Sequence, residues 1–211
     1  MNELYLLSGL GADKRVFDFL NLGEFKTHCI TWIPPHHDES IEAYAARLTE
    51  QIKTPRPILI GVSFGGMIAV EIAKVIKPEK IILISSARTN RDIPFYYRVA
   101  GAIGFNKLLY PKLLKKFTWL SFWLFGVTTQ MEKALLKSFI EETDDTFLCW
   151  AVDQITNWKN KSEFDNMISI HGTRDRLLPL RTADVKIKNG GHLMIVNKAD
   201  LISLHIKSIL K

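Results

Sequence analysis

Short, continuous apolar runs that alternate with longer helical patterns constrain this chain more than any other feature of its sequence. The run Ile81-Ile82-Leu83-Ile84 is apolar at every position, so a strand there needs cover on both faces. Such strands are typical of parallel sheets, whose connections place helices over both faces. The pattern predicts six strands, at residues 4–7, 27–33, 58–62, 80–85, 167–171 and 184–187. It also predicts helices at residues 40–52, with Ser40 as the N-cap, and at residues 64–76 and 198–210.

Strands that alternate with helices predict one doubly wound α/β domain with right-handed crossovers. The alternation is interrupted once, between residues 88 and 162, where helical patterning and many aromatic residues replace the strands. An insertion of this length between two strands is too long for a bare loop, so we expect a helical cap. The predicted division is therefore a core of residues 1–87 and 163–211, with a cap of residues 88–162.

The strongest functional pattern lies where a predicted strand meets a buried helix. There the chain reads Gly61-Val62-Ser63-Phe64-Gly65-Gly66. A serine at such a tight turn has a strained backbone that projects its hydroxyl above the sheet, and crowding requires glycine two residues to either side. The helix that follows directs free N–H groups toward any oxyanion that forms. The alternative interpretation is a glycine-rich turn without chemistry.

This turn resembles the nucleophile elbow of α/β-hydrolase-fold esterases, thioesterases and lipases. The resemblance implies Ser63 as the nucleophile, with the N–H of Phe64 in the oxyanion hole. The loop Ser8-Gly9-Leu10-Gly11 is similar to the family's oxyanion loop, although serine replaces the usual histidine, and implies the N–H of Leu10 as the second donor. The usual antiparallel strand pair before this loop has no room here. We therefore expect an α/β-hydrolase fold with a truncated, mostly parallel sheet of about six strands, helices on both faces and a helical cap insertion.

The remaining triad members follow in the order expected for this family, Ser63, Asp175 and His192. The segment His171-Gly172-Thr173-Arg174-Asp175, followed by Pro179, resembles the family segment whose aspartate is the triad acid. His192 comes 17 residues after Asp175, on a Gly190-Gly191 corner after the last predicted strand. The alternative for Asp175 is a turn cap. We expect His171 to be a packing or hydrogen-bonding residue and not the base.

These residues predict a serine hydrolase that cleaves a carboxylic ester or thioester through an acyl-enzyme. The chemistry requires no cofactor or metal, and the histidines form no metal-ligand pattern. Two alternatives stay open: a carbon–carbon bond hydrolase or cofactor-free peroxidase on the same fold, and a ligand-binding protein without activity. The expected partner is a small-molecule substrate. The cap aromatics favour an apolar one, but they equally fit simple packing of the cap.

The net charge of +6 comes from scattered lysines and arginines, and no nucleic-acid-binding motif accompanies it, so we expect no nucleic acid partner. Residues 88–131 hold seven basic residues and one acid, Asp92. We favour a solvated helix surface for the basic stretch with Lys112, Lys115 and Lys116. Contact with an anionic membrane surface, or steering of an anionic acyl carrier, is the alternative. The two cysteines, Cys29 and Cys149, suggest no disulfide framework, which favours a reducing cytoplasm. The sequence does not indicate the oligomeric state.

Overall fold

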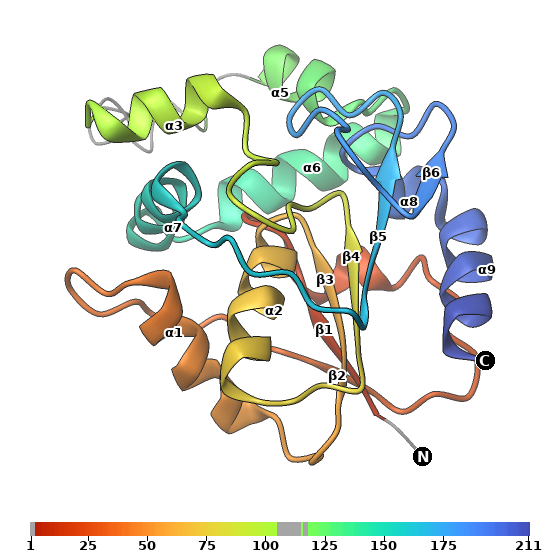
Figure 1. Ribbon diagram of the computed structural model, residues 1–211. Coiled ribbons are helices and arrows are strands. Elements are labelled where there is room, and N and C mark those ends of the chain that lie inside the picture. Colours follow the sequence, from red (N-terminus) through yellow and green to blue (C-terminus); the bar gives the residue numbers. More distant parts are fainter. Residues whose placement is uncertain (1–2, 105–114, 116–117) are drawn as a thin grey trace.

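The computed structural model describes residues 3–104, 115 and 118–211. One six-stranded sheet has the order β2-β1-β3-β4-β5-β6, and all neighbouring strands run parallel (Figure 1). The strands are β1 (Leu4–Leu7), β2 (Thr27–Cys29), β3 (Ile58–Val62), β4 (Lys80–Ile84), β5 (Met167–Gly172) and β6 (Val185–Ile187). The α-helices are α1 (Ile41–Leu48), α2 (Phe64–Val75), α3 (Phe95–Ala102), α5 (Thr118–Phe125), α6 (Gln130–Glu142), α7 (Asp145–Asn157), α8 (Met194–Asn197) and α9 (Ala199–Leu210). Two short 3-10 helices, η1 (Lys14–Phe17) and η2 (Thr49–Gln51), complete the described elements.

The sheet separates two hydrophobic cores, as continuous apolar strands require. Tyr5 and Leu7 of β1 belong to the core that contains α1 and α2. Leu4 and Leu6, which alternate with them, belong to the core that contains α8 and α9. Figure 1 shows α1 and α2 on one side of the sheet and α9 on the other. The predicted fold class is therefore confirmed.

Strand β2 is shorter than the sequence pattern predicts. The prediction of a strand over residues 27–33 was wrong beyond Cys29, although the N–H of Ile30 still donates to the carbonyl of Leu6. β2 is an edge strand, and its single neighbour β1 ends at Leu7. The next N–H groups bind side chains instead, Thr31 to Gln51 and Ile33 to Tyr44. The apolar sequence pattern of β2 continues to residue 33, but its partner strand β1 has already ended, so the ladder of hydrogen bonds stops.

The order of the strands determines where a site can form. From β1 the chain moves to one edge for β2 and then crosses back to the other side for β3. In parallel α/β sheets, such a switch point opens a crevice at the carboxyl ends of the two strands. Leu7 is paired with Gly61, so the loop after β1 lies beside the turn after β3.

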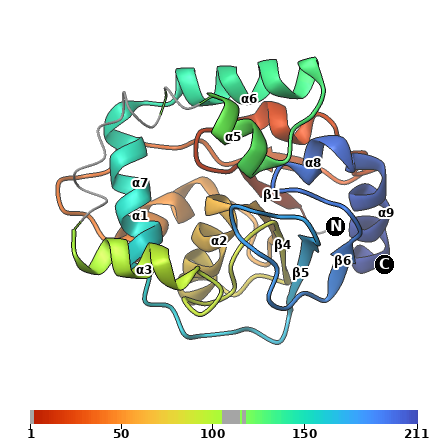
Figure 2. The ribbon, with the colours of Figure 1, turned by 90° about the horizontal axis from the view of Figure 1, so that it is seen from above.

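Helices α3, α5, α6 and α7 lie between β4 and β5 in the chain and cover the carboxyl end of the sheet (Figures 1 and 2). All described elements in this insertion are helical, as predicted, while the division at residues 88 and 162 stays a prediction. Within the described ranges, no helix combines the length and apolarity that crossing a bilayer requires.

Candidate active site

Ser63 forms the whole connection between β3 and α2. β3 ends at Val62 and α2 begins at Phe64, and Ser63 has φ 51° and ψ −121°. This conformation costs a non-glycine residue on the order of 1–3 kcal/mol, so the surrounding structure must enforce it. The Ser63 N–H donates to the carbonyl of Ile84 at 2.9 Å, which fixes the turn against β4. Although Ser63 is the N-cap of α2, its hydroxyl caps no N–H of the helix and is left for another partner.

Two glycines in this turn are required by space. A Cβ on Gly61 would come within 3.0 Å of backbone atoms of Gly65 and Gly66. A Cβ on Gly65 would overlap the carbonyl oxygens of Leu7 and Ser8 in the neighbouring loop. These are backbone atoms and cannot rotate away. The elbow is therefore closed by packing against the β1 loop as well as by its own dihedral angles.

The structure brings the three predicted triad residues together. His192 Nε2 lies 2.8 Å from Ser63 Oγ, and His192 Nδ1 lies 2.8 Å from Asp175 Oδ2. Asp175 and His192 are 5% and 3% exposed, whereas Ser63 is partly open to solvent. Asp175 follows β5, and His192 follows the Gly190-Gly191 corner after β6. Residues up to 129 positions apart in the chain thus form one hydrogen-bonded line at the carboxyl end of the sheet.

The partners of His192 determine its tautomer. An ionised carboxylate only accepts hydrogen bonds, so the proton of a neutral His192 belongs on Nδ1. Nε2 then has a free lone pair and accepts from the Ser63 hydroxyl. This is the arrangement in which a serine can transfer its proton as it attacks.

Four donors surround the carboxylate of Asp175. Oδ1 accepts the N–H groups of Leu177 and Leu178, at 3.0 and 2.8 Å. Oδ2 lies 3.2 Å from Nε2 of His171, in addition to its contact with His192. Burial by itself would raise the pKa of Asp175, but the charge of His192 and the hydrogen bonds from both histidines lower it well below its usual range. Asp175 is therefore ionised at neutral pH.

His171 shares one N–H between two acceptors. Its Nε2 lies 2.8 Å from the carbonyl of Leu178 and also contacts Asp175, so this nitrogen must carry the hydrogen. Burial alone would lower the pKa of His171, yet the hydrogen bond to Asp175 and the charge of that carboxylate raise it. The prediction of a hydrogen-bonding part for His171 is confirmed.

The predicted oxyanion donors meet at the switch point, with Leu10 in the loop after β1 and Phe64 at the first position of α2. Within the described part of the chain, the N–H groups of Leu10 and Phe64 donate to no protein acceptor. A Cβ placed on Gly9 would lie 3.4 Å from Cβ of Ser63, which measures how closely the β1 loop approaches the serine. Both N–H groups thus remain available beside Ser63.

Sequence reasoning missed three residues around the triad. The hydroxyl of Ser86, just after β4, donates to the carbonyl of Ser63 at 2.6 Å and so links the β4 end to the nucleophile turn. The ring of Phe125 meets His192 edge-on at 5.2 Å. The guanidinium of Arg176 lies over the Trp123 ring, 4.7 Å from its centroid, and donates to the carbonyl of that residue. The only signal was the Ser85-Ser86 pair that ends an apolar strand next to the nucleophile strand.

A cavity of about 310 Å³ lies between the β1 loop, the loop after β2 and the ends of α6 and α7. Its apolar walls are Trp32, Ile33, Pro34, Phe139 and Phe147, and its polar lining includes Asp13, Arg15, Glu142 and Asp144. The triad does not line it, so it is not the reacting centre. The rings of Trp32 and Phe147 nevertheless lie 5.9 and 6.3 Å from that of Phe64, which follows the serine.

The basic stretch singled out in the sequence falls mostly outside the described residues, which exclude Lys112 and Lys116. The assignment of Lys115 to a solvated surface was wrong. Its ammonium donates to the carbonyl of Thr143 and pairs with Asp145 at 2.5 Å, because it reaches the turn between α6 and α7. In the described part of the chain, no three potential metal ligands come together.

Solved structures with the same fold carry different activities. A bromoperoxidase from Bacillus anthracis is 14% identical, with a TM-score of 0.69 over 100% of this chain and 92% of its own. An esterase from Exiguobacterium antarcticum is 15% identical, with a TM-score of 0.68 over 100% and 92% of the two chains. A meta-cleavage product hydrolase from Pseudomonas fluorescens IP01 is 14% identical, with a TM-score of 0.65 over 100% and 89%. At these identities the likeness establishes the fold alone.

A comparison with curated protein sequences found no match. A family model described as the alpha/beta hydrolase family matches residues 4–202, which includes every strand of the sheet as well as Ser63, Asp175 and His192. The chain therefore belongs to the alpha/beta hydrolase family.

Proposed function

We propose that this protein is a serine hydrolase that cleaves a carboxylic ester or thioester through an acyl-enzyme. The observation that carries the proposal is the unbroken line from Asp175 through His192 to Ser63, with both contacts at 2.8 Å. A line of this geometry supplies a nucleophile, a base and a group that orients the base. The strained conformation of Ser63 gives further support, because such strain persists where the surrounding structure enforces it and clusters at reacting centres.

The first half of the reaction forms the acyl-enzyme. Nε2 of His192 accepts the proton of Ser63 Oγ while that oxygen attacks the carbonyl carbon of the substrate. The imidazolium that forms is stabilised by Asp175, which stays ionised because its pKa is held low. His192 then donates the proton to the departing alcohol or thiol, which leaves the acyl group on Ser63.

The second half repeats this sequence with water. His192 takes a proton from water as the water oxygen attacks the acyl carbon. The imidazolium then donates that proton to Ser63 Oγ as the bond from this oxygen to the acyl carbon breaks, which releases the acid and restores the Ser63 hydroxyl. In both halves the N–H groups of Leu10 and Phe64 bind the negative oxygen. One such donor is worth about 10²–10³ in rate in serine proteases.

The surroundings of Phe64 favour an apolar substrate. Its ring belongs to an aromatic cluster with Trp32, Phe147 and Trp150, and two of these line the cavity of about 310 Å³. Ligand pockets begin at about this size and are lined mainly by apolar side chains. We place the apolar part of the substrate along this path, away from His192.

An active-site-directed fluorophosphonate tests the proposal. It should label the intact protein at Ser63, and the Ser63→Ala variant should stay unlabelled while melting at the same temperature. A panel of p-nitrophenyl esters, thioesters and a vinylogous diketone then identifies the bond. Equal labelling of both proteins, or none, would refute the serine nucleophile. Turnover of the diketone alone would replace ester cleavage with carbon–carbon cleavage.

A further inference from the structure

The outer surface of the cap exposes large apolar side chains that the mechanism does not use. Of the ten exposed large apolar side chains in the described part of the chain, six belong to α3, its C-cap and α5. They are Phe95, Tyr96, Val99, Ile103, Trp119 and Trp123, which we call the cap patch. Ile103 and Trp119 are each 72% exposed. Monomeric soluble proteins scatter such residues singly, so their concentration on two neighbouring cap helices indicates an interaction surface.

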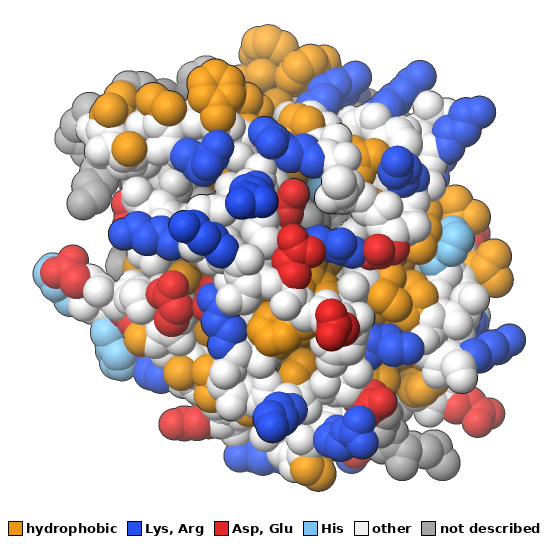
Figure 3. Space-filling view, viewed as in Figure 1, with side chains coloured by type: hydrophobic (Ala, Val, Ile, Leu, Met, Phe, Trp, Pro, Cys, Tyr) orange, Lys and Arg blue, Asp and Glu red, His pale blue; other side chains and the backbone are white. Residues whose placement is uncertain are grey.

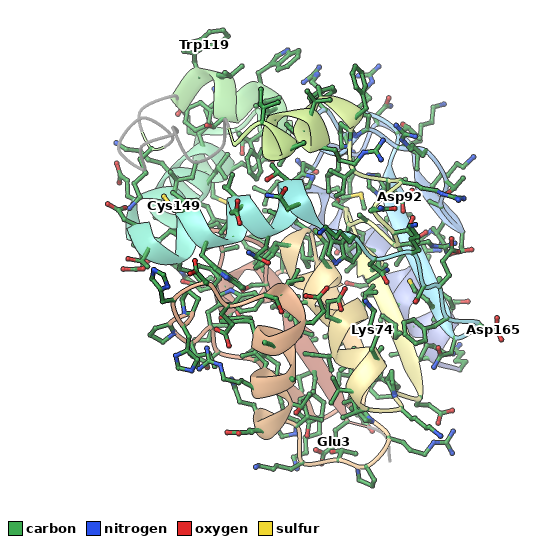
Figure 4. All side chains as sticks on the ribbon, turned by 60° about the vertical axis from the view of Figure 1, so that its left-hand side comes forward. Glu3, Lys74, Asp92, Trp119, Cys149 and Asp165 are labelled. Carbon is green, nitrogen blue, oxygen red and sulfur yellow. The ribbon has the colours of Figure 1, made fainter. Side chains whose placement is uncertain are left out.

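Helical spacing produces the cap patch. Phe95, Val99 and Ile103 are four residues apart and form a stripe along α3. Trp119 and Trp123 form the same spacing on α5, while Phe122 and Phe125 face the core. Figure 3 shows hydrophobic side chains gathered over both helices at the top of the molecule. In Figure 4 the side chain of Trp119 points away from the protein body.

The cap patch projects from the surface of the protein. Among the described residues, none of its six members lines the cavity of about 310 Å³. Protruding tryptophan, tyrosine and aliphatic side chains can insert into a lipid layer, because lipids are fluid and can pack around them. Tryptophan and tyrosine are the residues enriched at the boundary between lipid and water.

Cationic side chains surround the cap patch. Arg91 and Arg98 flank and interrupt the stripe on α3, and both are exposed. Arg176 lies on the ring of Trp123, and Arg174 is exposed on the same loop. The single acid among residues 88–131 is Asp92, whose carboxylate accepts the N–H groups of Arg88 and Thr89. The surface thus combines apolar residues with positive charge, as interfacial helices do.

We infer that the cap patch docks on an anionic phospholipid surface. The arginines complement phosphate headgroups, while a second copy of this chain would place like charges opposite one another. Docking would also bring lipid close to the site, because α5 carries Trp123 outside and Phe125 against His192. Supply of an apolar ester from the bilayer rests on the proposed function, but the docking itself does not.

Vesicle sedimentation with the Ser63→Ala protein separates docking from catalysis. We expect binding to vesicles of equal parts phosphatidylcholine and phosphatidylglycerol that exceeds binding to pure phosphatidylcholine by at least about tenfold. Raising the salt from about 0.1 M to about 1 M shortens the Debye length from about 10 Å to about 3 Å and should weaken this binding. The double variant Arg91→Glu and Arg98→Glu should lose at least about tenfold in affinity.

The apolar contribution has its own variants. Phe95→Gln with Trp119→Gln should lower vesicle affinity by at least about tenfold, because both side chains would enter the layer. Val75→Gln with Leu204→Gln is the matched control, since these exposed residues lie on α2 and α9. All variants change exposed positions, so circular dichroism and melting temperature should match the parent protein.

Three results would overturn the inference. Folded parent protein could fail to bind anionic vesicles, in which case an acidic protein would be the expected partner of the cap patch. Parent and cap-patch variants could bind vesicles equally, which would place lipid contact elsewhere. Light scattering could show a dimer that only the cap-patch variants dissociate, without vesicle binding, and a second copy would then be the occupant.

Discussion

At the β3–α2 turn every residue from Ile58 to Ala73 except Ser63 is buried, whereas α3 buries only Gly101 and exposes a stripe of apolar residues. The turn is fixed by backbone contacts that no side-chain rotation can relieve. In the described part of the chain, α3 contributes only the partly buried Tyr97 to the hydrophobic cores. This difference suggests a division of labour, in which the turn determines whether chemistry occurs and the cap determines what reaches it. The predictions below test that division.

The largest effect should come from Asp175→Asn. The amide can no longer fix the Nδ1–H tautomer of His192 or stabilise its positive charge, and in a serine protease the same change costs about 10⁴ in kcat. We expect a loss of this order in the turnover of whichever ester the protein accepts. Asp184→Asn is the control, since that carboxylate is half exposed and pairs with Arg88 away from the triad. A loss below about tenfold for Asp175→Asn would contradict its assigned part.

A pair of glycine variants compares the turn with the cap directly. Gly65→Ala forces a Cβ against backbone oxygens of Leu7 and Ser8, so we expect a loss of at least about 3 kcal/mol in unfolding free energy. Gly104→Ala, just beyond α3, meets no atom of the described residues within 4 Å, and its backbone has a φ of 70°. The strain of a Cβ at this φ costs about 1–2 kcal/mol. Urea unfolding of both variants measures the difference, and equal losses would abolish the contrast.

The pH dependence of stability tests the buried network next to the turn. The pKa of His171 is raised in the folded protein, so its proton stabilises the fold below about pH 6.5, and this contribution is lost as the pH rises through the folded-state pKa. The pKa of Asp175 is lowered, and its contribution is lost only in more acidic solution. The stability advantage of the parent protein over His171→Gln should therefore be larger at about pH 5.5 than at about pH 8.5.

The Asp175→Asn background provides the control for this measurement. Without the carboxylate that raises the pKa of His171, the stability lost through His171→Gln should no longer be larger at the lower pH, because burial alone lowers that pKa. If the pH dependence survives in that background, the raised pKa has another origin and His171 belongs to a different network.

The turn could be predicted from sequence because its pattern is local, although the space at Gly65 is limited by the distant β1 loop. The turn has one residue and joins a continuous apolar strand to a buried helix, which leaves little choice other than glycines at positions 61 and 65. The same patterns located five strands to within about one residue. Strand β2 was overextended because its length depends on where β1 ends. Ser86 went unnoticed since its contact with Ser63 requires two strands to be adjacent. The catalytic part of the triad stays a prediction until activity is measured.

The cap was harder to predict, because sequence shows which residues are aromatic but not which face outward. Phe122 and Trp123 are adjacent in the chain, yet one packs into the core and the other is 52% exposed. The position of α5 over the loop after β5 decides this, and no local pattern encodes that position. Lys115 illustrates the same limit, since its partner Asp145 lies 30 residues away.

The smallest effect should come from Arg176→Met, which removes a link between the cap and the loop that carries Asp175. An exposed cation–π contact contributes about 0.5–1 kcal/mol, and the hydrogen bond to the Trp123 carbonyl adds a similar amount at most. We expect a melting temperature lower by no more than about 8 °C, with KM changed more than kcat. Arg174→Met, exposed on the same loop, controls for the loss of charge. If Arg176→Met instead lowers kcat as Asp175→Asn does, then α5 positions the triad itself. The cap and the turn would in that case act as one unit, and substrate access and chemistry could not be assigned to separate parts of the chain.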